Sequence, residues 1–171
     1  MSTSPPKLLV IVGSTASGKK KLALDAAERF SGEIVSADSR KVYRHLDMGT
    51  AKPSPEDRAR VPHHLIDIVD PDEPFSAGEW VRRAAEAIRG ILDRGRLPII
   101  SGGTGFYISA FLDGLSDGIS PDTEIRERLD RELAEHGPER FHARLAAIDP
   151  VRASELPPGD TVRVMRALEI F

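Results

Sequence analysis

The 171-residue sequence contains no cysteine, which excludes disulfide bonds and thiolate metal sites. It lacks a long apolar run near its start, where Leu8–Val12 is too short for a membrane span or for the core of a signal peptide. It also lacks excess positive charge, since the net charge is -3, so any contact with nucleic acid must come from local arginine clusters. What remains, with 40% apolar and 30% charged residues, is typical of a soluble globular protein.

Short apolar runs and helical patterns alternate over the first part of the chain. The apolar runs predict buried strands at Leu8–Val12, Ile34–Ala37, Leu65–Val69 and Leu97–Ser101. Apolar residues at helical spacing predict helices at Lys19–Phe30 and from Ser76 to Gly95, and Ser76 with Glu79 fits a capping box. This alternation predicts an α/β fold in which a parallel sheet carries helices on both faces.

A candidate phosphate-binding loop follows the first predicted strand. Residues 13–20 fit the pattern G-x-x-x-x-G-K, with a strand before them and a helix after them. The glycines allow backbone N–H groups to turn inward as an anion site, and the N-terminus of the helix points at the same place. The alternative is an ordinary glycine loop. The predicted phosphate-binding residues are Gly13, Ser14, Thr15, Ala16, Ser17, Gly18, Lys19 and Lys20.

Lys20 departs from the pattern, because P-loops ordinarily carry serine or threonine here and that hydroxyl ligates Mg²⁺. A charged lysine cannot ligate the ion, and its flexible ammonium lacks the fixed coordination geometry of a metal. We therefore expect weakened Mg²⁺ binding. The alternative is that Lys20 points to solvent and that the metal is held through water.

The pattern changes after Asp113-Gly114. From Pro121 onward the sequence predicts only helices, one of which ends at Gly137 and the last of which begins at Asp160 as its N-cap. We expect residues 1–114 to form an incomplete P-loop α/β core, and residues 115–171 to form a helical, tRNA-binding insertion that begins the return to the core. Because the last helix has an open apolar side, we also expect a chain truncated at its C-terminus.

Further motifs follow the loop in a fixed order. They are Ser36–Ser39, Val42–Arg44, Met48–Pro53, Pro62–Asp67, Gly102–Gly105, Glu124–Arg126 and Arg163–Glu169. Taken together with the loop, this set resembles tRNA dimethylallyltransferase, also called tRNA isopentenyltransferase. The resemblance covers nearly the whole chain from about Leu8, and it implies a P-loop NTPase-like fold.

The resemblance also implies a reaction, in which a dimethylallyl group moves from dimethylallyl diphosphate to N6 of the adenine next to the tRNA anticodon. The loop would hold the diphosphate of the donor and stabilise the charge that builds on this leaving group. We expect Mg²⁺ as the cofactor, and dimethylallyl diphosphate and the tRNA anticodon stem-loop as partners. We further expect no membrane partner, a monomer and a cytoplasmic location.

Two residues match family positions at or near the reacting groups, and Lys19 of the loop supplies charge to the outer phosphate oxygens. Asp38 follows the second predicted strand and would accept the proton of the adenine amino group, although an aspartate there also caps turns. Thr104 matches a position near the reacting groups, with a turn residue as its alternative. The predicted catalytic residues are thus Asp38, Thr104 and Lys19.

Two segments match positions that contact tRNA, one at residues 38–41 and one on the later helices. Lys41 stands where many relatives have glutamine, and an ammonium can only donate hydrogen bonds, whereas an amide can pair with an adenine edge. Guanidinium groups suit phosphates and stacked bases, although solvated surface arginines are the alternative. The predicted tRNA-binding residues are Asp38, Ser39, Arg40, Lys41, Thr104, Arg126, Arg163 and Arg166.

Other interpretations of the sequence stay open. A P-loop on this fold also suits a small-molecule kinase that uses ATP, although such an enzyme needs the Mg²⁺ site that Lys20 weakens. A relative that prenylates free adenine nucleotides is a second alternative, and an inactive truncated fragment is a third. The adjacent His63 and His64 point to opposite faces of a strand, so we predict no metal site there.

Overall fold

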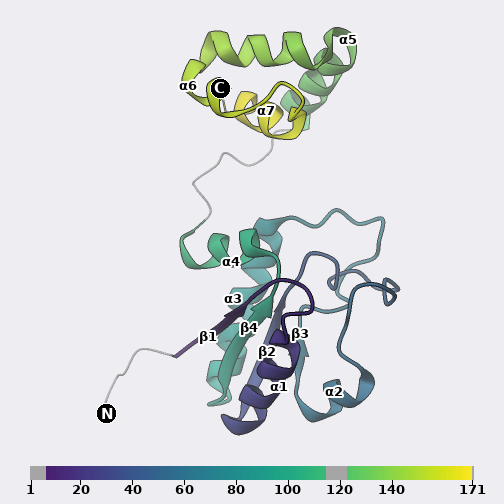
Figure 1. Cartoon of the computed structure of the whole chain (residues 1–171), viewed down its shortest axis with the longest axis vertical. Helices are drawn as coiled ribbons and strands as arrows, with labels where there is room; N and C mark the ends of the chain where they lie inside the picture. The colour runs from purple at the N-terminus through teal and green to yellow at the C-terminus, as the bar shows by residue number, and fades with distance from the viewer. Residues whose placement is uncertain (1–6, 115–122, 171) are drawn as a thin grey trace. The chain divides into compact units, whose positions relative to one another are not determined.

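A parallel β-sheet is the centre of the first part of the chain (Figure 1). The computed structural model describes residues 7–114 and 123–170, and the chain divides into two units, Met1–Leu115 and Ser116–Phe171. Within residues 7–114 the sheet has four strands in the order β1-β4-β2-β3. Their bounds are β1 Leu9–Val12, β2 Gly32–Ala37, β3 His63–His64 and β4 Leu97–Gly102. All three pairings are parallel, which confirms the predicted sheet.

The third strand differs from the prediction at Leu65–Val69. The strand that pairs with β2 is the short β3, and Val69 makes only an isolated bridge with Tyr43. Leu65 and Asp67 have positive φ angles of 60° and 57°, a left-handed conformation that breaks the extended backbone of a strand. The prediction of a strand here was therefore wrong. The apolar residues of this run gave no indication that the backbone turns at Leu65 and at Asp67.

Helices cover both faces of the sheet, as the sequence predicted (Figure 1). They are α1 Lys19–Arg29 on one face, and α3 Ala77–Asp93 with α4 Gly105–Leu112 on the other. The short helix α2 Pro55–Arg60 has no buried residue. Side chains alternate along β2, so Ile34 packs in the cluster with α1 and Val35 packs in the cluster with α3. The sheet is thereby buried on both faces, and the loops at the carboxyl ends of its strands are left to form a site.

Trp80 fixes α3 against the sheet. Its ring is fully buried and stacks on Tyr107 of α4, with 5.2 Å between ring centroids. Its indole N–H donates a hydrogen bond to the carbonyl of Ser36 at 2.9 Å, so the polar edge of the ring is satisfied inside the core. This hydrogen bond ties the core to the residue two positions before Asp38.

The N-terminus of α3 has half of the predicted capping box. The hydroxyl of Ser76 accepts from the backbone N–H of Glu79 at 3.1 Å. The Glu79 carboxylate instead accepts hydrogen bonds from Arg82 and Arg83, at 2.7 and 2.6 Å. Guanidinium groups one turn along the helix compete successfully for this carboxylate, because each offers a charge-assisted bond.

The second unit contains, within residues 123–170, helices and no strand. Helix α5 runs from Thr123 to Ile148 with a break at Gly137, which has φ 76°, and it is followed by α6 Pro150–Glu155 and α7 Thr161–Leu168. Leu129, Phe141 and Val164 are fully buried in its own core. Asp160 caps α7 by accepting from the N–H of Arg163 at 3.2 Å, as predicted. Phe171, the last residue of the sequence, lies outside the described residues.

No helix within residues 7–114 and 123–170 is both long enough and apolar enough to cross a membrane.

Candidate functional site

The loop between β1 and α1 has the conformation that an anion site requires. Ala16 and Gly18 have left-handed backbones, with φ of 64° and 83°, and the N–H of Ser17 closes a turn on the carbonyl of Ser14 at 3.3 Å. Gly18 is the N-cap of α1, and it has no side chain to accept from the first N–H groups of the helix. Those groups remain available to a bound anion, and the helix dipole favours negative charge there.

A cavity of about 900 Å³ opens in front of this loop. The loop, the segment after β2 and the segment after β4 lie together at it, because the carboxyl ends of parallel strands meet at one edge of a sheet, and residues between 49 and 66 complete its lining. The predicted site residues that line it are Ser14, Thr15, Ala16, Ser17, Gly18, Lys19, Lys20, Asp38, Ser39, Arg40, Lys41 and Thr104. Within the described chain, Gly13 is the one predicted residue of the loop that does not line it.

Gly102 brings the last two of these elements together. A Cβ atom at this position would lie 1.9 Å from the carbonyl oxygen of Ala37, so only glycine permits this approach of β4 to β2. The backbone N–H of Thr104 then donates to the same carbonyl at 3.1 Å. The segment that carries Thr104 is therefore held beside the segment that carries Asp38.

Asp38 uses one carboxylate oxygen for the local turn. Its Oδ1 accepts from the backbone N–H groups of Arg40 at 3.0 Å and Lys41 at 3.3 Å. Its Oδ2 lies 3.8 Å from Nζ of Lys41, and the side chain is 26% exposed at the cavity. The turn-capping role is thus present, and it leaves a second oxygen for another partner. The catalytic role of Asp38 stays a prediction.

Lys19, Lys20 and Lys41 bring three ammonium groups to the cavity. Lys19 donates to the Ser14 carbonyl at 2.6 Å, and Lys20 forms an ion pair with Asp57 at 2.8 Å. Burial lowers the pKa of Lys41 from its usual value; Asp38 opposes this shift, and the nearby charges of Lys19 and Lys20 add to it.

The alternative that Lys20 points to solvent is met only in part, because 48% of its side chain is exposed while its ammonium forms an ion pair with Asp57. A hydrogen bond from Lys20 is the main cause that lowers the pKa of Asp57. Asp57 was not predicted as a site residue. The sequence feature that marks Asp57 is the capping-box spacing of Ser54 and Asp57 at the start of α2. Both reciprocal hydrogen bonds of this box are 3.2 Å long.

The donor set does not suit the magnesium site of an ordinary P-loop. At position 20 a hydroxyl ligand is replaced by an ammonium that is already bound to a carboxylate. Among the described residues no group of three or more His, Asp or Glu side chains could hold a metal ion. His63 and His64 have separate partners, the Val61 carbonyl at 2.8 Å and the Glu33 carboxylate at 2.7 Å.

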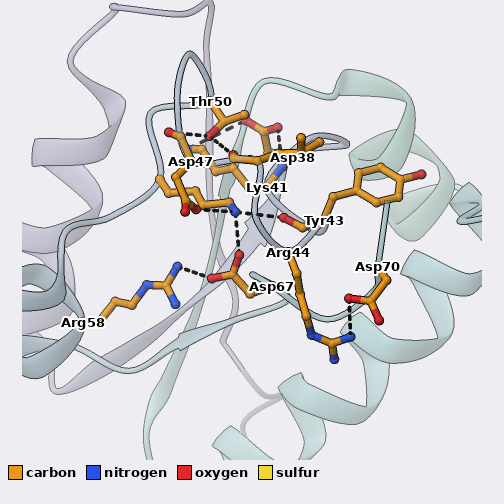
Figure 2. A network of polar contacts seen from close by, with 11 residues as sticks. Asp38, Lys41, Tyr43, Arg44, Asp47, Thr50, Arg58, Asp67 and Asp70 are labelled. Carbon is orange, nitrogen blue, oxygen red and sulfur yellow. Dashed lines mark hydrogen bonds and ion pairs between the residues drawn. The ribbon is translucent and has the colours of Figure 1, made fainter. Parts of the chain in front are cut away.

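Lys52 lies in the sequence between Ala51 and Pro53, which line the cavity. It binds Tyr43, Asp47 and Asp67, which Figure 2 shows close together with Arg58. Its side chain is 6% exposed, and its ammonium donates to the Tyr43 carbonyl and Asp47 at 2.8 Å each and to Asp67 at 2.5 Å. Arg58 donates to the other oxygen of Asp67 at 2.6 Å. The sequence alone indicates no role for Lys52, because its partner Asp67 lies 15 residues further along the chain and no local pattern links the two.

The three predicted arginines of the second unit each contact a carboxylate. The Glu169 side chain is 3% exposed, and its two oxygens lie 2.7 Å from Arg166 and 3.5 Å from Arg126. Arg163 donates through Nε to Asp160 at 2.6 Å. One buried carboxylate thus gathers Arg126 and Arg166, and contact of these residues with tRNA stays a prediction.

Comparison with known proteins agrees with this architecture. The parallel sheet and its loop define a P-loop-type α/β protein. The family model for IPP transferase matches residues 41–171, so the chain belongs to that family. A tRNA dimethylallyltransferase of Chloroflexus aurantiacus is 54% identical over 96% of this chain and 56% of its own length.

Solved structures place the chain in the same family. The full-length tRNA isopentenylpyrophosphate transferase of Bacillus halodurans is 44% identical, with a TM-score of 0.65 over 97% of this chain and 55% of its own. A eukaryotic dimethylallyltransferase acting on tRNA is 31% identical, with a TM-score of 0.84 over 97% and 41%. These matches confirm the resemblance and the fold class. The chain spans about half the length of the curated relatives it matches.

Proposed function

We propose that the chain transfers a dimethylallyl group from dimethylallyl diphosphate to N6 of the adenine next to the anticodon in tRNA. The observation that carries this proposal is the single cavity in which the anion-binding loop, Lys19 and the Asp38 carboxylate lie together. Membership of the IPP transferase family supports it, as do relatives named tRNA dimethylallyltransferase.

The loop binds the diphosphate of the donor. N–H groups at the start of α1 and the ammonium of Lys19 stabilise the negative charge that builds as the bond between the allylic carbon and the diphosphate breaks. The N6 amino group of adenine forms the new C–N bond, and the diphosphate leaves with the electron pair of the broken bond. Most of the catalysis is therefore orientation and charge neutralisation.

Asp38 accepts the proton that N6 loses. An exocyclic amine is a weak nucleophile, so removing its proton as the bond forms assists the reaction. Oδ1 holds the turn through Arg40 and Lys41, while Oδ2 is the oxygen for the proton. Thr104 positions this segment, because its hydroxyl accepts from the N–H of Ser39 at 3.0 Å.

The RNA partner is the anticodon stem-loop of tRNA. A base in such a loop leaves its stack at small cost, and it then reaches a pocket bordered by Ser39, Arg40 and Lys41. Arg126, Arg163 and Arg166 supply cations for the RNA backbone. The protein works as a monomer, and a tRNA substrate places it in the cytoplasm. Magnesium, the expected cofactor, would neutralise charge on the diphosphate, and Lys20 weakens its binding.

The test is a modification assay with the full chain, labelled dimethylallyl diphosphate and an anticodon stem-loop that carries the target adenine. We expect label in the RNA, and none when guanine replaces that adenine. Asp38→Asn keeps an acceptor for the turn while it removes the base, so turnover should fall by about 10²–10⁴-fold. Asp38→Ala should lose the turn as well.

Three outcomes contradict the proposal. Phosphoryl transfer from labelled ATP to a small molecule, without prenylation, would identify a kinase. Donor binding without any labelled RNA would identify an inactive fragment. Full turnover in Asp38→Asn would remove the carboxylate from the reaction.

A further inference from the structure

The candidate diphosphate cavity contains an excess of cationic side chains. Among its described lining residues are Lys19, Lys20, Lys21, Arg40 and Lys41, against the single carboxylate of Asp38. One P-loop lysine is enough for the motif, so the others need a separate explanation. Binding of a highly charged anion without a metal ion would explain these additional cations.

We propose that Lys20, together with Lys41, neutralises the bound diphosphate in place of a divalent cation, so that the diphosphate binds without magnesium. This inference rests on the diphosphate site proposed above. Lys20 lies in the first turn of α1, at the position whose hydroxyl ordinarily reaches the metal of a P-loop. The positive charge at this position is then supplied by the ammonium of Lys20 and not by a metal ion.

Asp57 keeps the ammonium of Lys20 near the loop before the ligand binds. The ion pair is 2.8 Å long, and 48% of the Lys20 side chain is exposed, so its flexible stem is free to turn toward the cavity. Diphosphate oxygens carry more charge than a carboxylate and also accept from the start of α1. The diphosphate therefore competes with Asp57 for Lys20.

Lys41 adds a second ammonium from the segment after β2. Its side chain is 17% exposed, and its Nζ lies 3.8 Å from the Asp38 carboxylate, longer than a hydrogen bond. Burial lowers the pKa of Lys41, Asp38 opposes this shift, and the charges of Lys19 and Lys20 add to it. A bound anion attracts all three ammonium groups and so offsets their mutual repulsion.

A purely structural role for Lys20 is the competing explanation. The pair of Lys20 and Asp57 joins α1 to the start of α2, which would stabilise the wall of the cavity. The two explanations predict opposite effects on anion binding when Asp57 is replaced. If Asp57 only supports the fold, its loss should weaken anion binding as the loss of Lys20 does. If Asp57 competes with the diphosphate, its loss should strengthen binding.

Calorimetric titration of the full chain with inorganic pyrophosphate tests the inference, once in EDTA and once with excess Mg²⁺. Because Mg²⁺ also binds free pyrophosphate, the quantity compared among variants is the ratio of the two dissociation constants. For the wild type we expect binding in EDTA and a ratio within about threefold of one. Lys20→Thr should bind about 10-fold more weakly in EDTA and recover affinity with Mg²⁺. The matched control Lys7→Thr, an exposed lysine outside the cavity, should behave as the wild type.

Asp57→Asn completes the design, since an amide oxygen still accepts from the N–H of Ser54. We expect pyrophosphate to bind about two- to fivefold more tightly in EDTA. Equal weakening by Lys20→Thr and Asp57→Asn would overturn the inference. So would a wild type that binds pyrophosphate only with Mg²⁺, a result that leaves the proposed function standing. No binding in either buffer would overturn both the diphosphate site and the inference.

Discussion

The hydroxyl of Thr104 accepts a hydrogen bond from the backbone N–H of Ser39 at 3.0 Å, across 65 residues of sequence. This bond joins the segment after β4 to the residue that follows Asp38. The Thr104 hydroxyl thus satisfies the Ser39 N–H, and both residues line the cavity. The relationship gives Thr104 a positioning role that its neighbours in the sequence do not reveal.

Thr104→Val should therefore slow prenyl transfer more than it weakens donor binding. Valine keeps the shape of threonine and removes the acceptor, so the Asp38 segment loses its fixed position. We expect kcat to fall about 10- to 100-fold, because small misplacement of a reacting group costs that much. Steady-state kinetics on the stem-loop measure this, with KM for the donor nearly unchanged. Thr104→Ser retains the hydroxyl and should recover most of the rate; an equally slow serine variant would contradict the prediction.

Lys52→Met should destabilise the first unit. The substitution leaves Asp67, Asp47 and the Tyr43 carbonyl without their shared donor in a place where the lysine side chain is 6% exposed. We expect the free energy of unfolding to fall by about 2–3 kcal/mol. The one tryptophan of the chain, Trp80, is buried in this unit, so its fluorescence in a urea titration reports this unit alone.

Lys7→Met is the matched control for that experiment, because Lys7 is exposed. It should change the free energy of unfolding by less than about 0.5 kcal/mol. A Lys52→Met protein as stable as this control would show that the network in Figure 2 contributes nothing net to folding.

Glu79 should make the first unit sensitive to acid. Hydrogen bonds from Arg82 and then Arg83 lower its pKa from 4.5 to about 2. A depressed folded-state pKa contributes stability that is present above the unfolded value and is lost as the pH falls from 4.5 toward about 2. Because the carboxylate is 31% exposed and screened, we expect no more than about 1 kcal/mol. Trp80 fluorescence melts over this range should show a shallower pH dependence for Glu79→Gln than for the wild type. Parallel curves would exclude the effect.

The parallel sheet, helices α1 and α3 and the phosphate loop were predictable because their signals are local, whereas α2 and α4 were not predicted. Ile34 and Val35 belong to a run of apolar residues, and Gly18 and Lys19 belong to one motif. The failed strand at Leu65–Val69 shows the limit. The backbone there is left-handed at Asp67, whose carboxylate is held by Lys52 and Arg58, and no pattern within five residues encodes those contacts.

The candidate site divides in the same way. Asp38 and Thr104 were found through motifs, whereas Asp57 reaches Lys20 only after α2 folds back beside α1. The capping-box spacing of Ser54 and Asp57 is typical of a helix start, but it carries no information about which lysine the Asp57 carboxylate meets. The charges around the cavity thus depend on partners that are distant in the sequence, and only the tertiary structure shows which residues pair.

Alanine variants of Arg163 and Arg166 should distinguish an effect on RNA binding from an effect on the stability of the second unit. Both offer a guanidinium to RNA, so alanine at either position should weaken binding of the anticodon stem-loop and reduce the slope of log K against log salt by about 0.7–1. Of the two, Arg166→Ala also removes the cation 2.7 Å from the buried Glu169 carboxylate, which Arg126 faces at the longer distance of 3.5 Å.

Arg166→Ala should accordingly lower the stability of the second unit by about 1–3 kcal/mol, because an undercompensated buried charge is costly. Arg163→Ala should leave stability within about 0.5 kcal/mol, since Asp160 still accepts from the backbone N–H of residue 163 as the helix cap. Hydrogen exchange of amides in α5 and α7 measures the first effect where Trp80 fluorescence does not report. Adding Glu169→Gln to Arg166→Ala removes the buried charge and should restore part of the lost protection. If the double variant is no better protected than Arg166→Ala, the buried charge is not the cause of the loss.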